Sequence, residues 1–292
     1  MDIHLSKASL SILDVLYHYH FAWKNDLDAI LGFTQRSAKA QRALKELKAM
    51  DLIHSTVLPG HSRRELHALT QKGYLYLKKE LGFPEQDIVE RDLRLENLTT
   101  GFLKHEGLVT HAAGEFFKDA RRHDIELFDR RELLSHIEPE ARVNRESDRV
   151  KLFQVRASND AIKETQRPDD LFLLQRPGHR GSVVCVEVDR GTESLRPRVG
   201  KTIKGQVAGM MNVYLEAYRR KFFRTYFGDF NVRVMFIIST SYSGQKRKKN
   251  FEDLWREVGE GRSTNFPCFT TLDEFEEYGP INLLNLPLAG KK

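Results

Sequence analysis

Two apolar runs in the C-terminal half of the chain place the strongest constraint on its fold. Residues 182–189 (SVVCVEVD) and 232–238 (VRVMFII) carry apolar side chains at nearly consecutive positions rather than at every second one. Strands of this kind are buried on both faces, as in sheets whose two sides are covered by helices. Each run is far shorter than the roughly 20 apolar residues that a membrane-spanning helix needs. The runs therefore predict an α/β fold with an internal sheet and no membrane span.

Length and composition agree with two globular domains. The chain has 292 residues, of which 40% are hydrophobic and 30% are charged, whereas one typical domain has roughly 100–200 residues. Its two cysteines, Cys185 and Cys268, are too few for a disulfide framework or a zinc site. The first ten residues lack the charged-then-apolar order of a signal peptide. We therefore expect a cytoplasmic location.

Positive charge is concentrated in two segments. The chain as a whole has a formal net charge of +6. Between residues 195 and 225 the only acidic residue is Glu216, against eight basic residues: Arg196, Arg198, Lys201, Lys204, Arg219, Arg220, Lys221 and Arg224. Residues 246–249 (KRKK) form a second basic run. Uneven positive charge is typical of surfaces that bind phosphate groups, although the exposed face of a helix can have the same composition.

The first 82 residues predict three helices, a β-hairpin and a fourth helix. Helical spacing of apolar residues extends over residues 5–21, a short helix follows Asp26, and a third follows Thr34. Residues 52–58 and 65–69 have the composition of two strands joined by a turn. This order, with the junction Leu69-Thr70-Gln71-Lys72-Gly73 after the second strand, resembles the winged helix-turn-helix of bacterial regulators.

The resemblance implies that the third helix enters the major groove of DNA and that the wing contacts the DNA backbone. The residues that match these two positions are Gln35, Arg36, Lys39 and Arg42 in the third helix, and His61, Arg63 and Arg64 at the wing tip. A winged helix used for protein contact is the alternative interpretation. Winged helices often pair on two half-sites, so the sequence leaves a homodimer open.

The rest of the chain predicts a linker and a larger domain. Residues 83–100 have the composition of a linker or connecting helix, and residues 101–292 alternate between helical and strand patterns. A long helix is expected over residues 202–223. Its Tyr214 is assigned to the core, with an approach to a nearby site as the alternative.

Acidic residues flank two adjacent predicted strands in this domain. Asp169 and Asp170 precede the strand at residues 171–174, and Glu187 and Asp189 end the strand at residues 182–189. Residues two apart in a strand project from the same face. Burying such carboxylates is costly unless their charge is compensated, and a divalent cation is one compensation. Exposure at the strand end, or pairing with Arg190 and neighbouring cations, is the alternative.

The motifs Arg167-Pro168-Asp169 and Glu187-Val188-Asp189 resemble the PD-(D/E)xK nuclease core, that is, the restriction-endonuclease-like fold. Residues 187–194 (EVDRGTES), placed after a winged helix, are similar to the bacterial replication-relaxation family of plasmids and other mobile elements. The resemblance implies a DNA-acting protein of replication or mobilisation. It also implies a winged helix-turn-helix followed by a mixed sheet with flanking helices.

Carried over to this sequence, the nuclease pattern makes Asp169 and Glu187 ligands of Mg²⁺ or Mn²⁺. Asp189 occupies the position of the usual lysine and would act as a third ligand or as a water-orienting base. Lys201 or Lys204 would then stabilise the charge that develops in the transition state. This arrangement requires the three carboxylates to converge beside a positively charged groove.

The sequence therefore favours a metal-dependent DNA endonuclease or nickase. The alternative is a non-catalytic DNA-binding accessory protein or regulator. Either function could involve replication or mobilisation partner proteins. The sequence contains neither a G-x-x-x-x-G-K-[ST] loop nor a G-x-G-x-x-G fingerprint, which argues against ATPase and dinucleotide-dependent activities.

Overall fold

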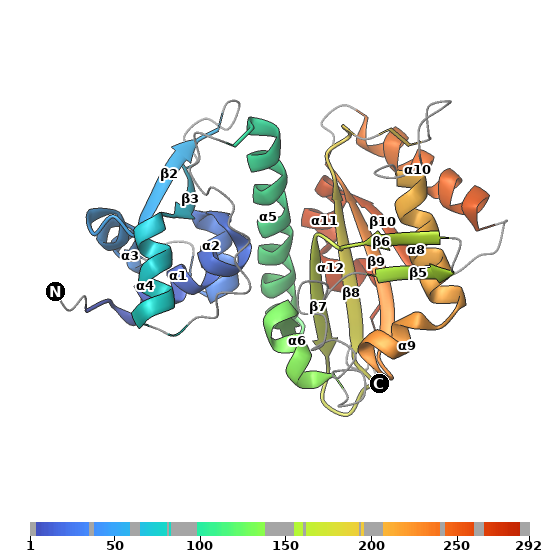
Figure 1. Cartoon of the computed structure of the whole chain (residues 1–292), viewed down its shortest axis with the longest axis horizontal. Coiled ribbons are helices and arrows are strands. Elements are labelled where there is room, and N and C mark those ends of the chain that lie inside the picture. Colours follow the sequence, from blue (N-terminus) through green and yellow to red (C-terminus); the bar gives the residue numbers. More distant parts are fainter. Residues whose placement is uncertain are drawn as a thin grey trace. The chain divides into compact units, whose positions relative to one another are not determined.

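The chain divides into two compact units, Met1–Lys118 and Asp119–Lys292 (Figure 1). The structure is a computed structural model. It describes residues 4–34, 38–58, 65–80, 82, 98–137, 155–159, 162–192, 194–195, 207–239, 243–259 and 266–286.

The N-terminal unit has the order of elements that defines a winged helix. In chain order these are α1 (Lys7–Tyr19), β1 (Phe21–Trp23), α2 (Lys24–Leu31), α3 (Ala38–Ala49), β2 (Ile53–Val57), β3 (Glu65–Leu69) and α4 (Gln71–Glu80). The strands form an antiparallel sheet in the order β1-β3-β2. The predicted winged helix-turn-helix is confirmed at the level of fold. The short strand β1 was not anticipated, because three residues are too few to show a period.

The junction between the wing and α4 explains the Leu69-to-Gly73 motif physically. Thr70 directly precedes α4: its hydroxyl donates to the carbonyl of Asp51 over 2.7 Å and accepts the amide hydrogen of Gly73 over 3.0 Å. A Cβ atom on Gly73 would lie only 2.0 Å from the carbonyl oxygen of Leu52. Only glycine therefore lets α4 approach the end of α3 this closely.

The long helix α5 (Thr100–Arg122) packs its first half on the winged helix. The hydroxyl of Thr110 donates to the carbonyl of Phe21, and His111 Nδ1 lies 2.9 Å from Asp26 Oδ1. The division between the two units falls within this helix, after Lys118. The sequence placed its linker at residues 83–100, of which residues 83–97 lie outside the described part.

The C-terminal unit is a mixed sheet with helices on its faces, as predicted. Its five-stranded sheet has the order β10-β9-β8-β7-β4, in which β4, β7 and β8 are antiparallel neighbours and β8, β9 and β10 are parallel neighbours. A two-stranded sheet joins β5 and β6. The elements are β4 (Glu126–Asp129), α6 (Arg130–His136), β5 (Val155–Asn159), β6 (Ile162–Gln166), β7 (Asp170–Gln175), β8 (Ser182–Asp189), α8 (Val207–Arg219), α9 (Phe222–Phe227), β9 (Asn231–Ile238), α10 (Gly244–Val258), β10 (Pro267–Thr271), α11 (Leu272–Tyr278) and α12 (Pro280–Leu283).

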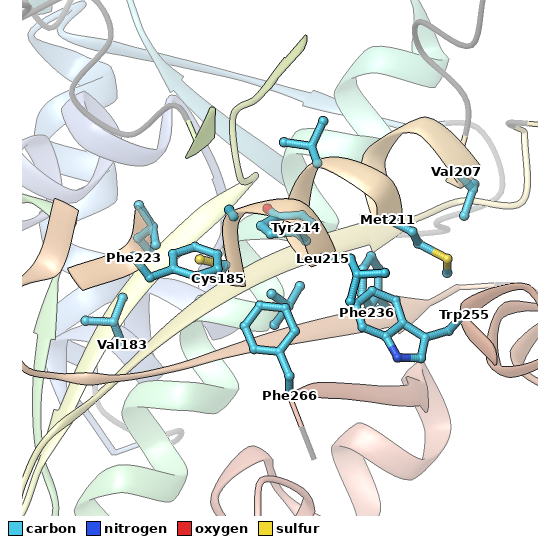
Figure 2. Close-up of a cluster of buried hydrophobic side chains, with 14 of the residues drawn as sticks. Val183, Cys185, Val207, Met211, Tyr214, Leu215, Phe223, Phe236, Trp255 and Phe266 are labelled. Atoms are coloured by element: carbon cyan, nitrogen blue, oxygen red, sulfur yellow. The ribbon is translucent and has the colours of Figure 1, made fainter. Parts of the chain in front are cut away.

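Strand β8 lies at the centre of this sheet and is buried along its whole length. One of its faces contributes Val183 and Cys185 to a large apolar cluster with α8 and α10. Figure 2 shows Tyr214 of α8 within this cluster, above the ring of Phe236 from β9. The ring centroids of Tyr214 and Phe236 lie 6.2 Å apart in an edge-to-face arrangement. This packing fixes which polar groups of α8 and α10 reach the end of β8.

The helix expected over residues 202–223 is shorter and is broken. Helix α8 ends at Arg219, and Lys221 adopts a left-handed conformation with φ of 59° before α9 begins. A residue with positive φ ends an α-helix, because the next backbone N–H no longer points along the axis. The apolar pattern continues across the break, so the periodicity did not reveal it.

Candidate functional site

Acidic residues gather where β7 begins and β8 ends. The two strands are antiparallel and Asp170 pairs with Val186, so the start of β7 lies beside the end of β8. Asp169 directly precedes β7, and its Oδ2 atom accepts the backbone N–H of Val188 over 2.7 Å. The carboxylate of Asp169 therefore lies against the segment that carries Glu187 and Asp189.

Glu187 is buried, with only 5% of its surface exposed. Two neutral groups donate hydrogen bonds to its carboxylate. The hydroxyl of Tyr214 and the side-chain amide of Gln166 both donate to Glu187 Oε1, the amide over 3.0 Å. Burial, followed by the nearby Glu187 carboxylate, raises the pKa of Tyr214 well above its ordinary value. The phenol consequently keeps its proton and remains a donor. Tyr214 is thus both a core residue and a contact of the acidic site.

A guanidinium group from α10 binds Asp189. Arg247 donates to Asp189 through both Nε and Nη2, with Nη2 at 2.8 Å from Oδ1. Both side chains are largely buried, and the guanidinium also lies 5.5 Å from the ring centre of Phe251. Glu187 and Asp189 do share a face of β8, as strand alternation requires. The charge of Asp189 is compensated by Arg247, rather than by the Arg190 considered from the sequence.

The set of possible metal ligands is smaller than the sequence suggested. Across the residues that the structure describes, no three His, Cys, Asp or Glu side chains are arranged to hold a metal ion. Asp169 and Glu187 are the two neighbouring carboxylates that could contribute to such a site. Lys201 and Lys204 lie outside the described residues.

Asp170 belongs to the opposite face of the sheet. It is 2% exposed, and its Oδ1 accepts the N–H of Leu171, while Oδ2 has no hydrogen-bond partner among the described residues. Burial raises the pKa of Asp170 to about 7, against the opposing effect of Arg130. Asp129 of β4, also 2% exposed, raises it further. Asp170 is therefore a separate buried group and not part of the Glu187 site.

The described basic residues between 195 and 225 lie at the other end of the sheet. Among them, Arg224 binds Asp229 Oδ1 at 3.0 Å. The same atom binds Arg180 at 2.8 Å, and Arg180 precedes the start of β8. Ser182 at the start of β8 pairs with Asn231 at the start of β9. At about 3.3 Å per residue, the eight residues of β8 separate this end from Asp189 by roughly 25 Å. These cations therefore do not line a groove beside the acidic site.

In the winged helix, two of the predicted DNA-contacting residues are described. Lys39 and Arg42 are exposed on α3, opposite the residues that α3 buries in the core: Ala40, Ala43, Leu44 and Leu47. The ammonium group of Lys39 lies 6.0 Å from the ring centre of Phe33. Gln35, Arg36, His61, Arg63 and Arg64 lie outside the described residues.

The sequence matches no protein-family model, no curated protein and no solved structure. In the part of the chain that the structure describes, no helix is both long and apolar enough to cross a membrane.

Proposed function

We propose that this chain is a cytoplasmic DNA-binding protein of plasmid or mobile-element replication or mobilisation. Its winged helix binds duplex DNA, and it acts as a non-catalytic accessory protein or regulator. The observation that carries DNA binding is α3, the third helix of a winged helix. This helix exposes Lys39 and Arg42 on the side away from its buried stripe. In proteins of this fold that surface enters the major groove.

Charge on α3 fits this role. Lys45 is exposed together with Lys39 and Arg42, whereas Lys48 is held by Glu65 of β3. Each cation that contacts a phosphate displaces a counterion, so DNA affinity falls with salt at a slope of about 0.9 per contact. The combination of an exposed basic helix and a wing supports duplex DNA as the partner.

The double variant Lys39→Ala/Arg42→Ala tests this assignment. Binding to a duplex should weaken, and the slope of log affinity against log salt should fall by about 2. Fluorescence anisotropy at several salt concentrations measures both quantities. Lys79→Ala on α4 is the matched control, since it removes an exposed cation from another helix. An unchanged slope in the double variant would reassign this face to protein contact.

The Asp189–Arg247 pair supports the non-catalytic assignment. A buried carboxylate calls for a metal ion only when the chain itself leaves its charge uncompensated. Here Arg247 neutralises Asp189, which would otherwise be the third metal ligand. In the active nuclease pattern a lysine takes the position of Asp189 and assists the reaction. This pair points to a fold that kept its shape after the chemistry changed.

A metal-dependent DNA endonuclease or nickase is the second candidate. It is favoured by the placement of Asp169, whose carboxylate lies against the backbone beside Glu187. These two residues would hold Mg²⁺ or Mn²⁺, which supplies an activated water and neutralises charge on the phosphodiester. Arg247 and Tyr214 would then orient the acidic residues.

Cleavage of supercoiled plasmid in Mg²⁺ or Mn²⁺ separates the two candidates. If the protein is a nuclease, the wild type nicks the plasmid, and Asp169→Asn and Glu187→Gln abolish nicking without changing DNA affinity. Asp273→Asn, at an exposed position of α11, is the control. If the wild type leaves the plasmid intact with either metal while it still binds DNA, the non-catalytic function stands.

A further inference from the structure

A basic surface lies where α8 meets α9, at the far end of the sheet from Asp189. Its exposed cations are Arg180, Arg219, Arg220, Lys221 and Arg224. Glu216 binds both Arg219 and Arg220, at 3.4 and 3.0 Å. Asp229 binds both Arg180 and Arg224. Among the described residues, five cations and two acids thus leave an excess of three positive charges in this α8–α9 surface.

The backbone turn at Lys221 holds these cations close together. Its left-handed conformation, with φ of 59°, ends α8 and starts α9 within two residues. The N–H of Lys221 donates to the carbonyl of Tyr218 over 3.1 Å, which closes the turn. Such a conformation costs about 1 kcal/mol or more for a residue with a side chain. The turn brings Arg224 of α9 back toward the end of α8.

An exposed aromatic ring lies among these cations. Tyr218 is 46% exposed, although its ring packs on Phe266 with centroids 4.6 Å apart. Phe266 is itself buried, at 3% exposure, against Phe223 and Trp255. Figure 2 shows Phe266, Phe223 and Trp255 within the apolar cluster of this unit. The ring is therefore held in place from below while part of it faces solvent.

We propose that the α8–α9 surface binds a single strand of DNA. Its excess positive charge attracts backbone phosphates, and the supported ring of Tyr218 offers a base a surface for stacking. Bases in a duplex are already stacked and paired, so their faces are out of reach of a side-chain ring. An unpaired base presents both faces. This surface would act in addition to duplex binding by the winged helix.

Anisotropy of the full chain with a labelled oligothymidylate of about 20 nucleotides, longer than one typical single-strand site, tests the proposal. Tyr218→Leu keeps an apolar contact with Phe266 but removes the ring. It should weaken single-strand binding by roughly 5- to 100-fold with an unchanged salt slope. The double variant Lys221→Ala/Arg224→Ala should lower that slope by about 1.4, because each single-strand phosphate contact contributes about 0.7.

Two exposed residues provide matched controls. Tyr278 of α11 is 51% exposed and lies beside Glu277, so Tyr278→Leu should leave single-strand affinity unchanged. Lys249→Ala removes an exposed cation of α10, outside the α8–α9 surface, and should leave the salt slope unchanged. Both controls separate a local effect at the α8–α9 surface from a general loss of apolar or positive surface.

Affinity for duplex DNA distinguishes a failure of the single-strand proposal from a failure of the winged-helix assignment. Tyr218→Leu and the Lys221/Arg224 variant should leave affinity for a short duplex unchanged, whereas the Lys39/Arg42 variant weakens it. The proposal fails if Tyr218→Leu binds oligothymidylate like the wild type, or if Tyr278→Leu weakens binding equally. It also fails if the α8–α9 variants lose duplex and single-strand affinity to the same extent. None of these results alters the winged-helix assignment.

Discussion

The two ends of β8 differ in the sign and the burial of their charges. At its C-terminal end Glu187 and Asp189 are buried, and partners on other elements meet their carboxylates. At its N-terminal end Arg180 and the cations of the α8–α9 surface are exposed and outnumber the acidic residues that the structure describes beside them. A buried charge is costly without a partner, so the fold must supply one. Exposed charges carry no such cost and remain suited to binding a ligand.

The largest effect is expected from Arg247→Ala. It leaves the carboxylate of Asp189 buried without its counter-ion, which typically costs about 3–5 kcal/mol. Urea unfolding followed by Trp255 fluorescence, in a Trp23→Phe background, reports on this unit alone. The double variant Asp189→Asn/Arg247→Ala should recover part of the loss, because it removes the unpaired charge as well. Equal stability of the wild type and Arg247→Ala would contradict the claim that the buried charge of Asp189 depends on this partner.

The buried side chain of His67 should show the next largest effect, because its burial disfavours the protonated form. His67 of β3 is 2% exposed, and its Nδ1 has no hydrogen-bond partner among the described residues. Burial, with a contribution from Lys48 and against the opposing effect of Glu65, lowers the pKa of His67 from 6.5 to about 4. The folded state therefore keeps His67 neutral while the unfolded chain takes up a proton below pH 6.5.

Stability of the winged helix should accordingly fall as the pH drops from 6.5 toward 4, by at most about 3 kcal/mol from this residue. Above pH 6.5 the histidine is neutral in both states and adds no pH dependence. Unfolding at several pH values, followed by Trp23 fluorescence in a Trp255→Phe background, measures the trend. His67→Leu should flatten it, and an equally steep fall in that variant would assign the effect to other groups.

Tyr214→Phe is expected to have a moderate effect. The change removes one of the two donors to Glu187 Oε1 and leaves the ring in the core. Loss of a buried hydrogen bond to a carboxylate costs about 1–3 kcal/mol. In a Glu187→Gln background the same change should cost less, because the acceptor then carries no charge. Unfolding of the four variants gives the coupling between the two side chains, and zero coupling would contradict the assigned contact.

The smallest effect is expected from Arg220→Ala at the exposed end. Its side chain is 38% exposed and pairs with Glu216 one turn away on α8. Exposed pairs of this kind contribute at most about 0.5 kcal/mol. Stability measured by urea unfolding should therefore match the wild type within that margin. A loss as large as that of Arg247→Ala would show that the contrast between the two ends of β8 is mistaken.

Local pattern predicted most elements of the fold. The strands β3 and β8 have the bounds expected from their sequences, because their apolar patterns and turn residues mark both of their ends. Three-residue β1 and the β5–β6 hairpin carry no comparable signal. The break at Lys221 was also missed, since the apolar stripe continues from α8 into α9. Such breaks depend on one backbone conformation rather than on a repeated pattern.

The candidate site was only partly predictable. Asp169 and Glu187 were identified because acids at the ends of apolar strands are unusual. Arg247 was not singled out, as its run of four cations does not reveal which side chain turns toward the sheet. Gln166 gave no signal, since an isolated glutamine in a polar segment is common.

By itself the sequence determined that Glu187 and Asp189 share one face of a buried strand, because side chains alternate strictly along a strand. It did not determine what meets them. Tyr214 and Arg247 are 27 and 58 positions away in the chain, and they reach β8 only because α8 and α10 pack on that face. Periodicity is a local property, whereas the choice of a partner for a buried charge depends on how whole elements are packed together.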